Sequence, residues 1–188
     1  VDAAIAYFTA GRAMADIRIL NAAPAIPEGR RMFEHADVIV LNETELAAYT
    51  EARPGSASGA TGGTPQHDIA DTVIVEMARS LICRQDQSII VTMGARGVIT
   101  TSQHRWFATA AHDVEVIDTT GAGDCFCGAL AAALDEGLSQ SEAVEFANAA
   151  AALSVGRRGA ASSMPTRVEL QRATAAGDRI TFPRARYV

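Results

Sequence analysis

Residues 118–126 read DTTGAGDCF and mark a point where a strand turns into a helix. The run before them, VEVI at 114–117, alternates in polarity and predicts a strand. The run after them carries an apolar side chain at every fourth position and predicts an amphipathic helix: Phe126, Leu130 and Leu134. The glycines Gly121 and Gly123 therefore lie where the strand ends and the helix begins.

A turn of this kind is suited to bind an anion. Gly121, Ala122 and Gly123 are small enough to let a ligand come close to the backbone. The first amides of a helix lack intrahelical acceptors, and the helix dipole adds partial positive charge. Asp124 adds a carboxylate, which can take a proton from an attacking hydroxyl. The pattern indicates phosphoryl transfer to an alcohol, with Asp124 as general base and the amides of 121–124 as the anion hole.

The same residues also fit an ordinary strand-to-helix turn, since Asp is favourable in the first turn of any helix. Both interpretations stay open on this pattern alone. Two other nucleotide motifs are excluded. The chain contains no G-x-x-x-x-G-K-[ST], so it is not a P-loop NTPase, and Phe126 stands where a dinucleotide fingerprint needs its third glycine.

Composition limits the class of protein. The chain has 188 residues, is 48% hydrophobic and 20% charged, and has a net charge of −6. These values are typical of a soluble globular protein and argue against a general nucleic-acid surface. No apolar run approaches the ~20 residues of a membrane span, and no signal peptide is visible. The chain has three cysteines, an odd number, and they are not spaced like the ligands of a metal site: Cys83, Cys125 and Cys127. Unpaired cysteines suggest a reducing, cytoplasmic location.

Strands and helices alternate along the chain. This order predicts an α/β fold whose largely parallel sheet is covered on both faces, with ligands beyond the carboxyl ends of the strands. Strands are expected at 17–20, 37–41, 88–92, 97–101, 105–108 and 114–117, the last three antiparallel. Helices are expected at 3–15, 27–35, 42–50 and 67–83, and from about 122, 139 and 166. Capping boxes open the last two, and residues 52–66 form a flexible insertion rich in Gly, Ser, Ala and Thr.

The segment DTTGAGDCF resembles the C-terminal signature of the ribokinase (PfkB) family of sugar and nucleoside kinases. Three further segments are similar to family motifs in the same order. Residues 41–46, LNETEL, resemble the N-x-x-E motif, and 91–97, VTMGARG, resemble T-x-G-x-x-G. Residues from 147 to Pro165 resemble the closing helix and loop. The run LNAAPA at 20–25 is most similar to the ribokinase branch and points to D-ribose as the sugar.

The resemblance implies a ribokinase-like three-layer α/β/α sandwich. Residues 1–188 would be the C-terminal ATP-binding and catalytic portion of a single domain. The family's N-terminal portion, with its sugar-binding Gly-Gly-Asn motif and its lid, has no counterpart in this sequence. We therefore expect either a fragment of a longer protein or a natural truncation. A homodimer stays open, because family members often dimerise through the lid.

The resemblance also implies roles for particular residues. ATP, Mg²⁺ and a monovalent cation, usually K⁺, would bind beside the sugar. Residues implied at the nucleotide are Asn42, Glu45, Thr92, Gly94, Ala95, Gly123 and Asn148. Glu45 would help to place Mg²⁺ through water. Residues implied at the monovalent cation, mainly through their backbone, are Asp118, Thr120, Val155, Arg158 and Ser163.

Each of these assignments has a structural alternative. Asn42 and Glu45 directly follow a predicted strand and fit a helix N-cap with its acid at the third position. Thr92 and Gly94 fit an ordinary β-turn. Asn148 fits a solvated or helix-bonding side chain. A capping residue can also face a site, so both roles can hold for one side chain.

Three functions follow from the sequence. The first is a sugar kinase, most simply for ribose, represented by its C-terminal part. The second is a nucleotide-binding but inactive remnant. The third is a kinase of the same family for a fructose-type sugar, a sugar phosphate or a nucleoside. An upstream Gly-Gly-Asn segment would separate the first from the second, and a substrate panel would separate the first from the third.

Overall fold

The computed structural model describes residues 1–10, 17–51 and 70–175. The predicted insertion at 52–66 and the start of the predicted helix at 67–83 lie outside the described residues, as does the end of the helix predicted at 3–15. The chain divides into two compact units. The first unit comprises Val1–Met93 and Ile99–Ala108, and the second comprises Gly94–Val98 and Thr109–Val188. Each unit is described by itself.

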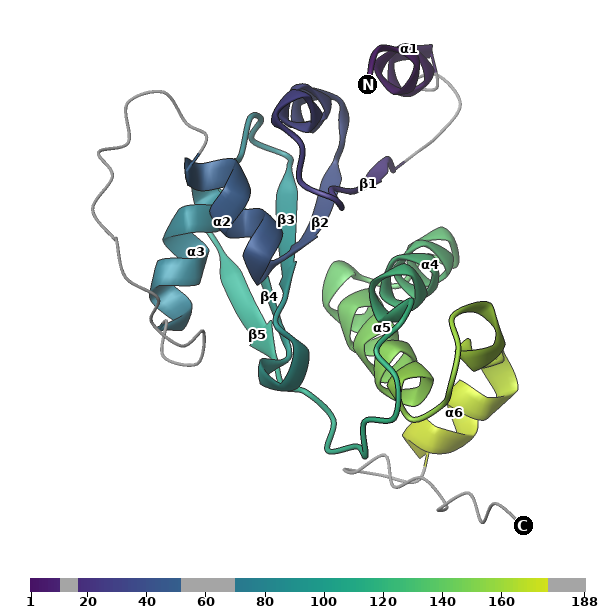
Figure 1. The fold of residues 1–188 in the computed structure, drawn as a ribbon. Coiled ribbons are helices and arrows are strands. Elements are labelled where there is room, and N and C mark those ends of the chain that lie inside the picture. The colour runs from purple at the N-terminus through teal and green to yellow at the C-terminus, as the bar shows by residue number, and fades with distance from the viewer. Residues whose placement is uncertain (11–16, 52–69, 176–188) are drawn as a thin grey trace. The chain divides into compact units, whose positions relative to one another are not determined.

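The described strands form one sheet in the order β1-β2-β3-β4-β5. The strands are β1 (Ile19–Asn21), β2 (Val38–Asn42), β3 (Ser88–Thr92), β4 (Val98–Thr101) and β5 (Trp106–Thr109). The first three are parallel, and each continuous apolar run of β2 and β3 is buried. Short turns join β3 to β4 and β4 to β5, and only antiparallel neighbours can be joined so tightly. The sheet is therefore mixed, and the predicted α/β class is confirmed (Figure 1).

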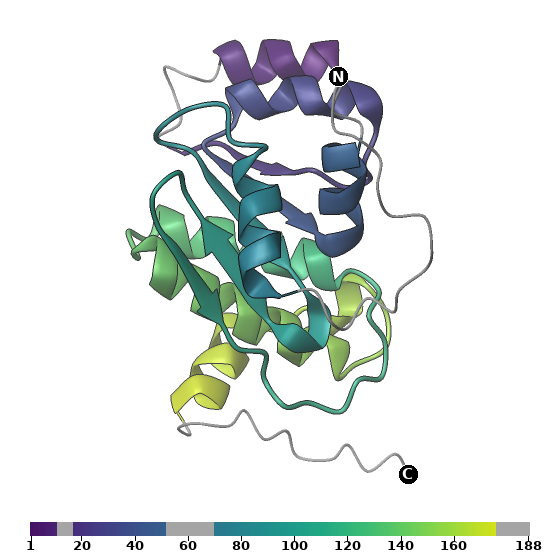
Figure 2. The ribbon, with the colours of Figure 1, turned by 90° about the vertical axis from the view of Figure 1, so that its left-hand side faces the viewer.

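Helices cover one face of the sheet in the first unit. They are η2 (Pro27–His35), which is a 3₁₀ helix, α2 (Glu43–Glu51) and α3 (Asp71–Arg79). Their buried side chains form one cluster with alternate strand residues: Phe33, Leu46, Tyr49, Ile74, Val75, Ala78, Ile39, Leu41, Ile89 and Val91. Figure 2 shows α2 and α3 side by side in front of the strands. A further helix, α1 (Asp2–Ala10), is joined to η2 by the 3.0 Å ion pair of Asp2 with Arg31.

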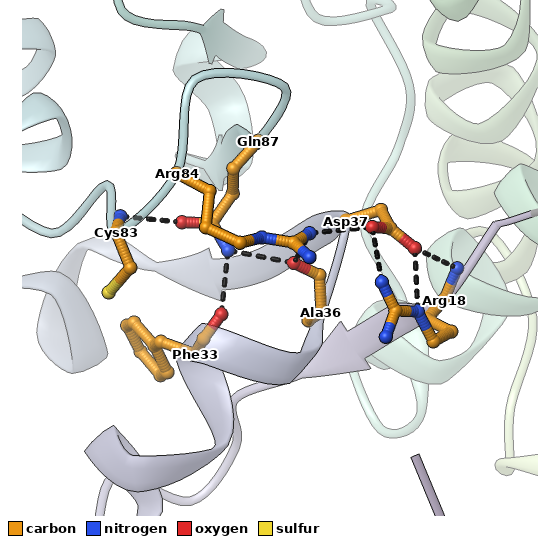
Figure 3. A network of polar contacts seen from close by, with 7 residues as sticks. All are labelled: Arg18, Phe33, Ala36, Asp37, Cys83, Arg84 and Gln87. Carbon is orange, nitrogen blue, oxygen red and sulfur yellow. Dashed lines mark hydrogen bonds and ion pairs between the residues drawn. The ribbon is translucent and has the colours of Figure 1, made fainter. Parts of the chain in front are cut away.

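A single carboxylate ties the amino ends of the three parallel strands together (Figure 3). Asp37 precedes β2, and its Oδ2 accepts hydrogen bonds from the backbone N and the Nε of Arg18, both at 2.9 Å. Its Oδ1 accepts from Arg18 Nη2 at 2.7 Å and from Arg84 Nη2 at 2.6 Å. Arg18 precedes β1 and Arg84 lies in the loop before β3. Asp37 therefore connects all three strands where they begin.

Gln87 completes this network from the interior. Its side chain is fully buried, and its Nε2 donates to the carbonyls of Phe33 and Ala36 at 2.6 and 2.7 Å. Its Oε1 accepts from the amide of Cys83 at 2.8 Å. Each of these carbonyls thereby accepts a second hydrogen bond, since the carbonyl of Phe33 also accepts the amide of Ala36 and that of Ala36 also accepts Arg84 Nη2. The amide of one side chain thus joins η2 to the loop before β3.

In the second unit, the regular elements that follow the last strand are all helices. It contains η3 (Gly94–Arg96), α4 (Ala122–Asp135), α5 (Gln140–Val155), η4 (Ala161–Ser163) and α6 (Arg167–Ala175). Small side chains let α4 and α5 pack closely, around a cluster of Cys125, Ala149, Ala150, Leu153 and Leu170 (Figure 1). Both predicted capping boxes are confirmed. Ser139 and Glu142 exchange hydrogen bonds at the start of α5, and Thr166 and Glu169 do so before α6.

Two sequence predictions need correction. Residues 114–117 are not a strand. A strand needs a ladder partner, but here the amides of Ile117 and Asp118 both donate to the carbonyl of Val155, at 2.8 and 3.1 Å, and Val116 is exposed. The helix predicted up to residue 83 ends at Arg79, because Leu81 and Ile82 form tighter turns with the carbonyls of Ala78 and Arg79. Among the described helices, none is long and apolar enough to cross a membrane.

Replacing Asp37 tests whether its carboxylate holds the strands. We expect Asp37→Ala to lower the free energy of unfolding by about 2–3 kcal/mol, since it leaves two guanidinium groups without their acceptor. Urea unfolding of both proteins measures the change. Asp2→Ala is the matched control, because Asp2 pairs with Arg31 at the surface and should change stability by less than about 1 kcal/mol. Equal effects of the two substitutions would contradict the role given to Asp37.

The same carboxylate predicts a loss of stability in acid. Burial raises the pKa of Asp37, but hydrogen bonds from Arg18 and Arg84 outweigh it and lower the pKa from 3.8 to about 2. A lowered pKa in the folded state means that the stabilisation is complete above 3.8 and is lost as the pH falls towards 2. We therefore expect the stability difference between the wild type and Asp37→Asn to shrink over that range. A difference that stays constant from pH 7 to pH 2 would contradict this assignment.

Candidate active site

The predicted anion site lies at the amino end of α4, and its shape requires a glycine at the N-cap. Gly121 has φ of 77°, in the left-handed region. A Cβ at this position would lie 3.3 Å from both the Cα and the Cβ of Ala160. Gly121 is therefore fixed by its backbone angle and by the loop that passes beside it. Gly123 is different, because a Cβ there would meet no atom within 4 Å.

The amides of this helix end are only partly used. The amide of Ala122 donates to the carbonyl of Thr119 at 3.2 Å, and that of Cys125 donates to Gly121 at 2.8 Å. No oxygen in the described part of the chain accepts the amides of Gly123 and Asp124. These two N–H groups and the open space beside Gly123 form a place where an oxyanion can meet the helix dipole.

Asp124 stands in the first turn of the same helix with an exposed side chain. Its carboxylate takes part in no hydrogen bond or ion pair with the described residues. A carboxylate beside open amides can accept a proton from a hydroxyl group while the amides hold a phosphate. The helix therefore offers both parts of the chemistry predicted from DTTGAGD.

Asp118 holds the loop before α4 in place. Its Oδ1 accepts from the amide of Thr120 and its Oδ2 from the amide of Gly159, both at 2.9 Å. Hydrogen bonds from Thr120 and from the Gly159 amide lower the pKa of Asp118 to about 2. Gly159 has φ of 93°. It was not predicted as a partner of Asp118, and only the fact that it is a glycine could have indicated an unusual backbone angle there. Asp118 thus joins the loop before α4 to the loop after α5.

This link brings together the segments predicted to bind a monovalent cation. Their carbonyl groups are not equally available. The carbonyl of Val155 already accepts two amides, and that of Arg158 accepts the hydroxyl of Ser162 at 3.3 Å. Ser163 is buried, and its hydroxyl donates to the carbonyl of Ala160 at 2.7 Å. Because the carbonyl oxygen of Val155 already accepts two hydrogen bonds, it is poorly suited to bind a cation as well.

Asn42 and Glu45 form a capping box at the start of α2, in the first unit. The amide of Asn42 donates to Glu45 Oε2, and the amide of Glu45 donates to Asn42 Oδ1, each at 2.9 Å. The helix-cap alternative is therefore confirmed. The cap does not use Glu45 Oε1, which remains able to accept a hydrogen bond from a metal-bound water. The described residues contain no cluster of three or more His, Cys, Asp or Glu that could hold a metal directly.

Thr92 lies beside Asn42, because the parallel register pairs these two residues at the ends of β3 and β2. The structure thus brings Asn42, Glu45 and Thr92 together at the carboxyl ends of β2 and β3. Gly94 and Ala95 follow β3 in an exposed turn, and Gly94 has φ of 54°, as expected of a turn glycine. In parallel sheets, ligands bind beyond these carboxyl ends of the strands.

Asn148 is neither solvated nor bonded to its own helix. It is 8% exposed, and its Nδ2 donates to the carbonyl of Ala110 at 2.8 Å. The side chain therefore fixes the segment after β5 onto α5. A backbone carbonyl carries no sequence signal, so this partner could not have been found from the sequence.

Comparisons with known proteins show which proteins the chain is similar to. The model of the pfkB family of carbohydrate kinases matches residues 1–167. The ribokinase of Haemophilus influenzae is 34% identical over 152 residues, which cover 80% of this chain and 45% of that protein. The chain thus spans about half the length of the curated relatives that it matches.

Solved structures show the same likeness. The crystal structure of ribokinase from Thermotoga maritima has a TM-score of 0.72 at 30% identity, covering 88% of this chain and 51% of that one. The structure of Arabidopsis thaliana ribokinase complexed with ribose and ATP has a TM-score of 0.63 at 28% identity, covering 82% of this chain and 46% of that one.

The two glycines of this turn should respond oppositely to alanine. We expect Gly121→Ala to lower the free energy of unfolding by about 1–2 kcal/mol, because φ and the contact with Ala160 both oppose a Cβ. Gly123→Ala should leave it unchanged or raise it by up to about 1 kcal/mol, since the site is helical and open. Chemical unfolding of the two variants measures the difference. A destabilised Gly123→Ala together with an unaffected Gly121→Ala would contradict the geometry of this helix end.

Proposed function

The chain belongs to the pfkB family of carbohydrate kinases, and we propose that the complete protein transfers the terminal phosphoryl group of ATP to the primary hydroxyl of a sugar. The observation that carries the proposal is the amino end of α4. There, open amides of Gly123 and Asp124 adjoin a carboxylate that is engaged by no described residue. The family match and the ribokinase structures support the same class of reaction.

The proposed mechanism assigns one task to each group. The amides at the start of α4 hold the transferring phosphoryl group and stabilise the charge that spreads over its oxygens. The carboxylate of Asp124 orients the sugar hydroxyl and accepts its proton as the hydroxyl attacks in line. Asp118 keeps the loop before α4 in position for both.

Asn42 and Glu45 are proposed to serve the nucleotide. Glu45 Oε1 would hold a water of the Mg²⁺ coordination shell, and Asn42 would orient a phosphate or another such water. Mg²⁺, when bound, supplies charge neutralisation for the phosphate oxygens. Thr92, Gly94, Ala95 and Asn148 would border the nucleotide. We place K⁺, when bound, at the oxygens around Asp118 and Thr120.

D-Ribose is the proposed sugar and ribose 5-phosphate the proposed product. The support comes from relatives, among them the ribokinase of Haemophilus influenzae and the Arabidopsis thaliana structure complexed with ribose and ATP. The second candidate is a fructose-type sugar, a sugar phosphate or a nucleoside, and the third is an inactive nucleotide-binding remnant. A cytoplasmic location and a homodimer belong to the same proposal.

Replacing Asp124 tests the mechanism. In the complete protein, we expect Asp124→Asn to lower kcat for ribose by about 10²- to 10⁴-fold, the usual contribution of a general base. ATP affinity should change little, since the substitution removes no phosphate donor. ADP release with Mg²⁺-ATP and K⁺ measures kcat, and a nucleotide titration measures affinity. Asp135→Asn is the matched control, since Asp135 is an exposed residue at the other end of α4.

The outcomes separate the candidates. Turnover with ribose that is lost in Asp124→Asn but kept in Asp135→Asn supports the proposal. Faster turnover with fructose, a fructose phosphate or adenosine would replace ribose and keep the mechanism. Comparable turnover of Asp124→Asn and the wild type would remove Asp124 from the role of base. ATP binding without turnover on any substrate would support the inactive remnant.

A further inference from the structure

A small cavity lies at the amino end of β3, in the first unit. Its volume is about 250 Å³, and its walls come from the end of α3, the loop before β3 and the turn between β4 and β5. The lining residues are Arg79, Ile82, Cys83, Arg84, Gln85 and Gln103. The proposed nucleotide residues Asn42 and Thr92 stand at the carboxyl ends of β2 and β3. The cavity is therefore at the other end of these strands and is not accounted for by the proposed reaction.

The walls of this cavity are rich in hydrogen-bond donors. Two guanidinium groups and two side-chain amides line it, and none of the six lining residues carries a carboxylate. Arg79 is held by its Nε, which donates to the carbonyl of Ser102 at 3.3 Å, and by its Nη1, which lies 3.4 Å from Glu76. Its Nη2 has no acceptor among the described residues. Gln85 and Gln103 are exposed and form no hydrogen bond within that part of the chain.

Arg84 is fixed in position but only partly neutralised. Its Nη2 donates to Ala36 and to Asp37, as Figure 3 shows. Asp37 shares its single negative charge between Arg84 and Arg18, so these three side chains carry a net positive charge. The Nε of Arg84 is buried and has no partner in the described structure. An arginine that is already ordered loses little side-chain entropy when it binds a ligand.

A third arginine, Arg30, contacts the lining residue Cys83. Arg30 Nη1 lies 3.2 Å from the sulfur of Cys83, and the Arg30 guanidinium is also stacked over the ring of Phe33, 4.6 Å from its centre. Against these cations stands Glu76, whose side chain is 73% exposed and therefore strongly screened by solvent. The four arginines named at and beside the cavity thus outnumber the two carboxylates paired with them, although the chain as a whole is acidic.

We propose that this cavity binds a small oxyanion, of the size of inorganic phosphate, between Arg79 and the amides of Gln85 and Gln103. Planar guanidinium groups bind the oxygens of phosphate or carboxylate through paired charge-assisted hydrogen bonds. The volume is below that of pockets for drug-sized ligands, which favours a compact anion over a nucleotide. The site lies at the end of the sheet opposite to Asn42 and Thr92, so its occupancy is separate from that of the proposed nucleotide edge.

Cys83 provides a local probe of occupancy, because it lines the cavity and is exposed. The experiment measures alkylation of Cys83 by iodoacetamide, followed by peptide mass spectrometry, in rising inorganic phosphate at constant ionic strength. We expect phosphate to slow alkylation by about threefold or more, with a half-effect near millimolar phosphate, the affinity of a few charge-assisted hydrogen bonds. Arg79→Gln should abolish the protection.

Two further variants make the result specific. Arg31→Gln removes one positive charge from an exposed residue outside the cavity and should keep the full protection. Gln103→Leu should weaken it without affecting folding, since Gln103 has no hydrogen bond to lose within the described residues. Protection that is absent in the wild type would overturn the proposal. So would protection that is equal in Arg79→Gln and Arg31→Gln, because it would then be a general effect of charge.

Discussion

The carboxylate of Asp37 is the constraint on which the first unit depends. Parallel strands have no hairpin to set their register, so something else must align their beginnings. Asp37 does this by accepting hydrogen bonds from the residues that precede β1 and β3. Once the strands are aligned at this end, their other ends are aligned too. In the resulting register Asn42 stands opposite Thr92, so contacts at the amino ends of these strands act together with the backbone ladder to bring these two side chains together at the carboxyl ends.

Local signals predicted local structure well. The Ser139–Glu142 capping box makes its hydrogen bonds within three residues, and the continuous apolar runs of β2 and β3 are the pattern expected of buried parallel strands, so the sequence alone was enough to predict them. Prediction failed where the partner is distant. Residues 114–117 alternate like a strand, yet their neighbour is the end of α5. The bonds of Asn148 to Ala110 and of Asp118 to Gly159 end on backbone groups, which no residue type identifies.

At the candidate site, the same side chains serve the fold and the proposed chemistry. Asn42 and Glu45 cap α2, and Asp118 holds two loops together, so the sequence pattern alone could not separate a structural role from a functional one. Asp124 differs from them, because no described residue engages its carboxylate. The proposed function rests on this carboxylate because it lies in the same helix turn as the open amides of Gly123 and Asp124.

The bond between Asp118 and Gly159 closes a long stretch of chain. The two residues are 41 positions apart, and the packed pair α4 and α5 lies between them. Helix packing and the hydrogen bonds from the amides of Ile117 and Asp118 to the carbonyl of Val155 hold both ends of this stretch near each other, so the Asp118 carboxylate meets the Gly159 amide at a high effective concentration. Closing the bond then requires little additional ordering of the chain. The loop in front of α4 is consequently preorganised in the free protein. A ligand at that helix end would therefore bind without the entropic cost of ordering this loop.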